Sequence, residues 1–182
     1  MRTPLLVSVA AVLALTACGE DFNLAPANDE NTVETASLYA LTNTSVTLPS
    51  GYELALERAV RTDQSSDFDF AFDIPAGGGP VFLQSGPLGL GEGSGFRPES
   101  TAFDSLVFAP LDGYVRDSAV TADSGATYVV RSRPTVCVFG NFAYFAKLRV
   151  LAVDTVARRV DFEILVNSNC GYRSLETGIP NR

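Results

Sequence analysis

The stretch Asp67-Phe68-Asp69-Phe70-Ala71-Phe72-Asp73-Ile74 decides the fold class, because its apolar and polar residues alternate with a period of two. Successive side chains of a β-strand point to opposite faces, so this period is typical of a half-buried strand. The buried face is expected to carry Phe68, Phe70, Phe72 and Ile74. The solvent face is expected to carry Asp67, Asp69, Ala71 and Asp73.

The same alternation returns twice near the end of the chain, on either side of a turn expected at residues 154–158. The two apolar sets are Ala146, Leu148, Val150 and Ala152, and Val160, Phe162, Ile164 and Val166. Antiparallel pairing of Val150 with Phe162 puts both sets on one face and places Arg149 opposite Glu163. The sequence therefore predicts a C-terminal β-hairpin.

Shorter runs extend this pattern through the rest of the chain. Further strands are expected over residues 37–41, 54–61, 80–84, 103–109 and 127–133. The segment 54–61 is also rich in good helix formers, so a short helix is the alternative there. Because no segment has a long 3.6-residue period, we predict an all-β domain, an antiparallel β-sandwich or open barrel.

The first 17 residues are typical of a secretory signal peptide. Arg2 precedes an apolar run over residues 5–15, which is too short for a bilayer that needs about 20 apolar residues. The run ends in Leu15-Thr16-Ala17-Cys18, which resembles the lipobox of bacterial lipoproteins. The resemblance implies cleavage before Cys18, lipidation of Cys18 and a place in the cell envelope. The simpler alternative is an ordinary cleaved signal peptide followed by a chance cysteine.

The residue after Cys18 and the segment that follows it bear on where the protein lies. Gly19, rather than Asp, implies by the same resemblance sorting to the outer membrane, facing the periplasm or the cell surface. Residues 18–35 are polar and acidic with little periodicity, so we expect a flexible tether there. The expected organisation is a signal peptide at 1–17, a lipidated tether at 18–35 and an all-β domain at 36–182.

Composition narrows the chemistry of the mature chain. The formal net charge is −8, and removal of residues 1–17 takes away one basic residue, Arg2, which leaves −9. An acidic chain is a poor partner for nucleic acid. The sequence contains no histidine, so a Ser-His-Asp or Cys-His nucleophile and His-ligated zinc or haem are excluded. We expect no cofactor.

With Cys18 assigned to the lipid, Cys137 and Cys170 remain as a pair. An even pair in an oxidising envelope indicates a disulfide, and two inert buried thiols are the alternative. Extending the predicted hairpin ladder brings the two cysteines towards its open end, so a bridge there is geometrically sensible.

Two groups of residues are candidates for a functional site. Asp63, Asp67, Asp69 and Asp73 are the densest carboxylate group. The last three are metal candidates, but calcium needs six to eight oxygens and a straight strand spaces them too far apart, so a solvated face is the simpler interpretation. Phe142 and Tyr144 lie in a run rich in aromatic residues and are candidates for a binding surface, although such runs also form core.

The segments Thr127-Tyr128-Val129-Val130-Arg131 and Tyr144-Phe145-Ala146-Lys147-Leu148-Arg149-Val150 are similar to the C-terminal strands of HmuY-like haem-carrier lipoproteins. The resemblance implies a lipid-anchored β-rich fold, but not haem binding, because the histidine ligands are missing. We therefore predict a non-catalytic envelope lipoprotein that attaches to the membrane through its lipid and serves a binding or structural role. A carrier of a small hydrophobic ligand is the alternative, and a carboxylate-based hydrolase comes third.

Overall fold

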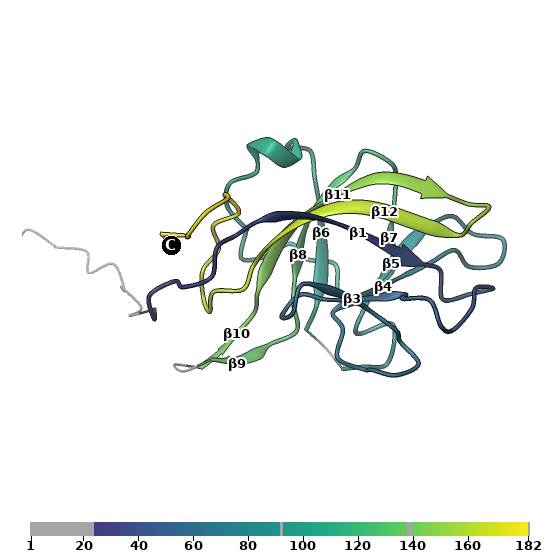
Figure 1. Ribbon diagram of the computed structural model, residues 1–182, viewed down its shortest axis with the longest axis horizontal. Coiled ribbons are helices and arrows are strands. Elements are labelled where there is room, and N and C mark those ends of the chain that lie inside the picture. Colours follow the sequence, from purple (N-terminus) through teal and green to yellow (C-terminus); the bar gives the residue numbers. More distant parts are fainter. Residues whose placement is uncertain (1–23, 92, 138–139, 182) are drawn as a thin grey trace, which may run out of the picture.

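The chain folds into an all-β, antiparallel sandwich, which confirms the predicted fold class. The computed structural model describes residues 24–91, 93–137 and 140–181, so the expected signal peptide and Cys18 lie outside the described residues. Two five-stranded sheets pack face to face without closing on each other (Figure 1). Sheet 1 has the order β1 (Val33–Tyr39), β12 (Arg159–Asn167), β11 (Phe145–Asp154), β8 (Thr127–Arg131), β6 (Gly95–Glu99). Sheet 2 has the order β3 (Arg58–Val60), β2 (Gly51–Glu53), β4 (Phe70–Asp73), β5 (Val81–Gln84), β7 (Val120–Thr121).

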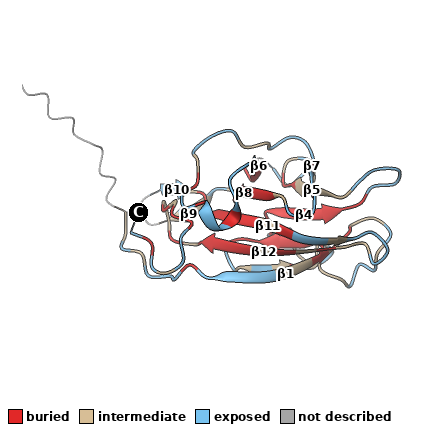
Figure 2. Cartoon of the chain, turned by 90° about the horizontal axis from the view of Figure 1, so that it is seen from above, coloured by how far each residue is buried: buried red, intermediate tan, exposed pale blue. Residues whose placement is uncertain are grey.

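Aromatic side chains fill the space between the two sheets. The buried aromatic residues there are Tyr52, Phe70, Phe72, Phe82, Phe96, Tyr128 and Phe162. The rings of Phe82 and Phe96 stack with centroids 4.9 Å apart, and Phe70 meets Phe96 edge-on at 5.0 Å. Burial of each such side chain contributes about 1.5–3 kcal/mol, and ring pairing adds about 0.5–1.5 kcal/mol. Figure 2 shows the result as buried strands, with the outer strand β1 largely exposed.

The stretch that decides the fold class forms β4, but its predicted solvent face is wrong. Phe70, Phe72 and Ile74 enter the core between the sheets as expected. Asp69 and Asp73 are 4% and 8% exposed, not solvated. The reason is that β4 is the central strand of sheet 2, and loop residues cover its outer face.

Phe68 also departs from the predicted face. It packs with Val60 and Ala71 on the outer side of sheet 2, against Leu88 and other loop residues. A side chain at Gly51 would approach the Phe68 ring to 2.9 Å, so the glycine in β2 makes room for this ring. The regular alternation of β4 therefore starts at Phe70, because the backbone before Phe70 directs the Phe68 side chain to the outer face of sheet 2.

The C-terminal hairpin, β11 and β12, confirms the predicted register. Val150 pairs with Phe162, and Arg149 pairs with Glu163, with which it forms an ion pair. A β-bulge after Val150 then shifts the register by one residue. Because of this shift Ala152 is exposed rather than buried, and Val153 packs against the core instead.

The other predicted strands are confirmed at β1, β5 and β8 and corrected elsewhere. Residues 54–61 are neither one strand nor a helix: β2 ends at Glu53, a turn follows, and β3 begins at Arg58. Residues 103–109 begin with a short 3-10 helix, η1 (Phe103–Ser105), not a strand. It covers the outer face of sheet 1 together with Leu106 and Leu175. No helix in the described part of the chain is long and apolar enough to cross a membrane.

The folded domain begins before the expected boundary at residue 36. The strand β1 starts at Val33, and Asn31 is 2% exposed. The Asn31 side-chain amide donates hydrogen bonds to the carbonyl oxygens of Ser174 and Glu176, at 3.3 and 3.0 Å. Residues 31–35 of the expected tether therefore belong to the domain, and hydrogen bonds of Ala25, Asn28 and Asp29 extend its contacts further towards the N-terminus.

Candidate functional site

A two-stranded ribbon stands apart from the two sheets at one end of the molecule (Figure 1). It consists of β9 (Thr135–Cys137) and β10 (Gly140–Phe142). The predicted disulfide is present: Cys137 of β9 is bonded to Cys170, with 6.1 Å between the two Cα atoms. A bridge that closes a loop of 33 residues stabilises a fold by about 3–4 kcal/mol in the chain-entropy model. It ties the ribbon to the segment that follows β12.

The ribbon forms one wall of a groove with a volume of about 270 Å³, called here the apolar groove. It is lined by both cysteines of the disulfide, Phe142, Tyr144 and the segment 24–26. The hydroxyl of Tyr144 lies 4.0 Å from Cys170 Sγ. The structure thus brings together the two aromatic residues expected on a binding surface, and it places both beside the disulfide.

Hydrogen bonds hold the N-terminal wall of the apolar groove in place. The backbone N–H groups of Asn28 and Asp29 donate to Asn169 Oδ1, at 2.9 and 3.1 Å. The Asn169 side chain donates back to the Asp29 carbonyl at 2.8 Å, and the Tyr172 hydroxyl donates to the Ala25 carbonyl at 3.0 Å. The local sequence does not signal this wall, because its partners lie about 140 residues away in the chain.

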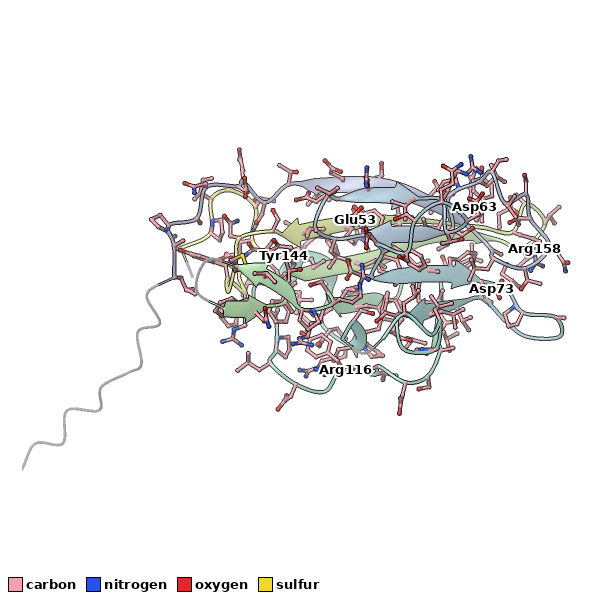
Figure 3. The ribbon with its side chains drawn as sticks, turned by 90° about the horizontal axis from the view of Figure 1, so that it is seen from below. Glu53, Asp63, Asp73, Arg116, Tyr144 and Arg158 are labelled. Carbon is pink, nitrogen blue, oxygen red and sulfur yellow. A yellow bond between two sulfur atoms is a disulfide. The ribbon has the colours of Figure 1, made fainter. Side chains whose placement is uncertain are left out.

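A second groove, of about 460 Å³ and called here the polar groove, lies on the other side of Tyr144, which lines both. Its other lining residues include Glu53, Asp67, Asp69, Ser132 and Arg133. Figure 3 shows Tyr144 towards the ribbon end of the molecule and Glu53 near its middle, with Asp73 and Arg158 towards the opposite end. Glu53 and Ser132 carry no signal in the local sequence, because only the packing of the two sheets brings them together.

Asp69 joins the two walls of the polar groove. Its carboxylate accepts hydrogen bonds from the backbone N–H groups of Leu54, at 2.9 Å, and Arg133, at 2.8 Å. The Arg133 side chain lies 3.6 Å away. Burial raises the pKa of the Asp69 carboxyl, and the hydrogen bonds and the charge of Arg133 oppose this rise. Since both oxygens are engaged, Asp69 positions the end of β2 and the segment after β8.

The predicted metal candidates do not share one site. Asp67 is exposed and lines the polar groove beside Asp69. Asp73 instead accepts hydrogen bonds from the backbone and the hydroxyl of Thr42, at 2.8 and 2.9 Å. Among the described residues there is no group of three His, Cys, Asp or Glu side chains arranged to hold a metal ion. Asp63 forms an ion pair with Arg61 in a different groove.

Carboxylates outnumber cations around the two grooves. Glu53 pairs with Arg58 at 3.0 Å, and Asp69 faces Arg133. Close by, burial raises the pKa of Glu57, a contact with Ser168 opposes the rise, and the charges of Glu34 and Asp29 add to it. A ligand of this end of the molecule is therefore expected to present basic as well as apolar groups.

The chain matches no known protein-family model, and no curated protein matches it.

Proposed function

We propose that the protein is a non-catalytic lipoprotein of the bacterial cell envelope, anchored through Cys18, which binds another envelope protein along its two grooves. The observation that carries the binding role is the convergence of Phe142, Tyr144 and the Cys137–Cys170 disulfide in one groove. Aromatic side chains at the centre of a surface groove are typical anchors of protein interfaces. The lipobox ending in Cys18 supports the anchoring.

Site-specific photocrosslinking in cells tests the binding role. A photoreactive phenylalanine analogue at Phe142 is expected to give a discrete adduct with one envelope protein. Val156, in the turn between β11 and β12, is the control position, since it is 94% exposed and lies outside both grooves. The absence of an adduct at Phe142, or the same adduct from both positions, would contradict the proposal.

Globomycin treatment of an expressing strain tests the anchoring separately. This compound blocks cleavage of lipoprotein precursors, so the precursor is expected to accumulate in treated cells. A Cys18→Ala variant is expected to lose its lipid and to leave the membrane fraction. Processing that proceeds unchanged in treated cells would show that Cys18 is not the lipidated residue.

A carrier of a small hydrophobic ligand is the alternative within the same class. The apolar lining around Phe142 and Leu24 supports it, whereas the filled aromatic core between the sheets favours the protein partner. Native mass spectrometry of the protein purified from its own host separates the two functions. A small molecule that co-purifies with wild type and is lost in Phe142→Ala would favour the carrier.

A carboxylate-based hydrolase is a second candidate function, because Glu53, Asp67 and Asp69 line the same groove. Such enzymes need a pair of carboxyl groups free to act as acid and base. Asp69 already accepts two backbone hydrogen bonds, which speaks against this role. Turnover of an aryl glycoside by wild type, and its loss in Asp67→Asn, would establish the hydrolase instead.

A further inference from the structure

The distance between the proposed lipid anchor and the folded domain is short. The ordered contacts begin as early as Leu24, which lines the apolar groove, and the carbonyl of Ala25 is already hydrogen bonded to Tyr172. Leu24 follows Cys18 by six residues. Six residues span at most about 21 Å when fully extended. The end of the domain that contains Leu24 is therefore kept near the membrane surface, if Cys18 is the anchor.

The ribbon β9–β10 lies at this same end. Leu24 and Cys137 line one groove, and a side chain at Gly171, next to Cys170, would approach Leu24 to 2.5 Å. Figure 3 shows Tyr144, just after the ribbon, and Arg158, in the turn between β11 and β12, towards opposite ends of the molecule. The anchor thus selects the ribbon end, and not the β11–β12 turn, as the part of the domain nearest the bilayer.

The ribbon has the surface chemistry that a lipid headgroup region accepts. The sequence contains no charged residue between Arg133 and Lys147. Val136 in β9 is 85% exposed, and Pro134 before it is exposed as well. Uncharged apolar side chains partition favourably into the membrane interface, whereas an isolated exposed valine gains nothing in water.

Charge decides which lipid surface fits. Asp29 lines the apolar groove, and Glu57 and Glu34 lie close to it. These carboxylates would be repelled by an anionic membrane surface. The ribbon therefore fits a zwitterionic surface, on which repulsion is weak and the uncharged strand residues make the contact.

We propose that the ribbon β9–β10 lies against the zwitterionic headgroup region of the membrane that holds the lipid anchor, with Val136 in contact with lipid. This inference rests on the proposed anchoring at Cys18. The lipid anchor and the uncharged ribbon then fix the orientation of the domain, because a second attachment acts at the high local concentration that the first provides. The grooves beside Tyr144 would open near the membrane surface.

Tryptophan fluorescence tests the orientation without background, because the chain contains no tryptophan. The full lipidated protein is prepared as Val136→Trp and, as a matched control, Val156→Trp, since both positions are exposed valines, at 85% and 94%. Each variant is bound to vesicles of phosphatidylcholine and phosphatidylethanolamine with and without brominated phosphatidylcholine. Thermal unfolding with the wild-type midpoint first establishes that both variants fold.

The expected result is a blue-shifted emission of Val136→Trp that brominated lipid quenches and acrylamide no longer reaches. Val156→Trp is expected to keep its emission in water. Equal acrylamide quenching of the two variants on vesicles would overturn the proposed orientation while leaving the anchoring intact. If neither variant floats with vesicles, or if Cys18→Ala floats equally well, the anchoring itself fails and the orientation with it.

Discussion

The core between the two sheets and the ribbon end of this sandwich are held together by different kinds of contact. Between the sheets, seven aromatic side chains from six strands fill the space, and each is held by many neighbours. At the ribbon end, two grooves remain open at the surface, and their walls are held by a disulfide, a buried carboxylate and a few long-range hydrogen bonds. Under the proposed function, this difference separates stability from recognition: the closed region supports the domain, and the open region presents Phe142 and Tyr144.

Replacing one phenylalanine by alanine in each region should give the largest difference in the free energy of unfolding. Phe70 is 0% exposed and touches three other aromatic rings edge-on or tilted, so Phe70→Ala should lower the free energy of unfolding by about 3–5 kcal/mol. Phe142→Ala, in the half-buried wall of the groove, should cost less than about 1.5 kcal/mol. Urea denaturation followed by circular dichroism measures both. Similar losses from the two substitutions would show that the groove is as much a part of the core as Phe70.

Removal of the disulfide should lower the stability of the whole domain and loosen the ribbon end in addition. The double variant Cys137→Ser and Cys170→Ser is expected to lose about 3–4 kcal/mol, since the unfolded chain regains the freedom of the closed loop. Amides of the central strands β11 and β12 exchange through global unfolding, so they should lose protection by this same amount, and faster exchange through local opening should be confined to β9 and β10. Wild-type protection in β11 and β12 would contradict the global effect, and faster local opening throughout both sheets would mean that the bridge supports the whole sandwich.

Within the part of the chain that the structure describes, one buried polar side chain of the closed region has no hydrogen-bond partner. Gln84 of β5 is fully buried, and neither atom of its side-chain amide has a hydrogen-bond partner among the described residues. An unsatisfied buried polar group costs about 1–3 kcal/mol. Gln84→Met, which keeps the shape and removes the polar atoms, should therefore raise the free energy of unfolding by about 1 kcal/mol.

The exposed Gln64 provides the control for this change, and Gln64→Met should leave the unfolding midpoint where it is. A lower midpoint for Gln84→Met would mean that the amide is stabilised by its surroundings.

The smallest expected effect is a pH dependence of stability that comes from Asp69 in the polar groove. Burial raises the pKa of Asp69 in the folded state. Its contribution to stability is therefore fully present below the unfolded pKa, about 3.9, and is lost as the pH rises through the folded value. The stability difference between wild type and Asp69→Asn should shift in favour of the variant as the pH increases from 4 to 7. Unfolding midpoints of the two proteins across this range measure the shift, and a pH-independent difference would contradict it.

The strand at β4 and the register of the β11–β12 hairpin could be predicted because both follow from neighbouring residues. Alternation marks the face of each strand, and the turn sets which residues pair, as Val150 with Phe162. The bulge after Val150 could not be predicted, since it changes one residue without breaking the local pattern. The burial of Asp69 and Asp73 could not be predicted either, because alternation reports only that a residue leaves the core face, not what covers the other face.

The candidate site was predictable only in part. Phe142, Tyr144 and the cysteine pair could be selected because aromatic residues and an even number of cysteines are informative by themselves. The partners of these residues could not, since Leu24, Glu53 and Arg133 come from distant parts of the chain and meet only after the sheets pack. The early start of the domain was hidden for the same reason: Asn31 looks like part of a polar tether until it hydrogen bonds to Ser174 and Glu176.

The amino-acid sequence by itself determined the all-β class, the hairpin register and the exclusion of histidine chemistry, because these depend on local period and on composition. Only the tertiary structure decided which aspartates are buried, where the grooves lie and how close the folded domain begins to Cys18. Those properties depend on contacts between residues far apart in the chain, and such contacts leave no local pattern to read.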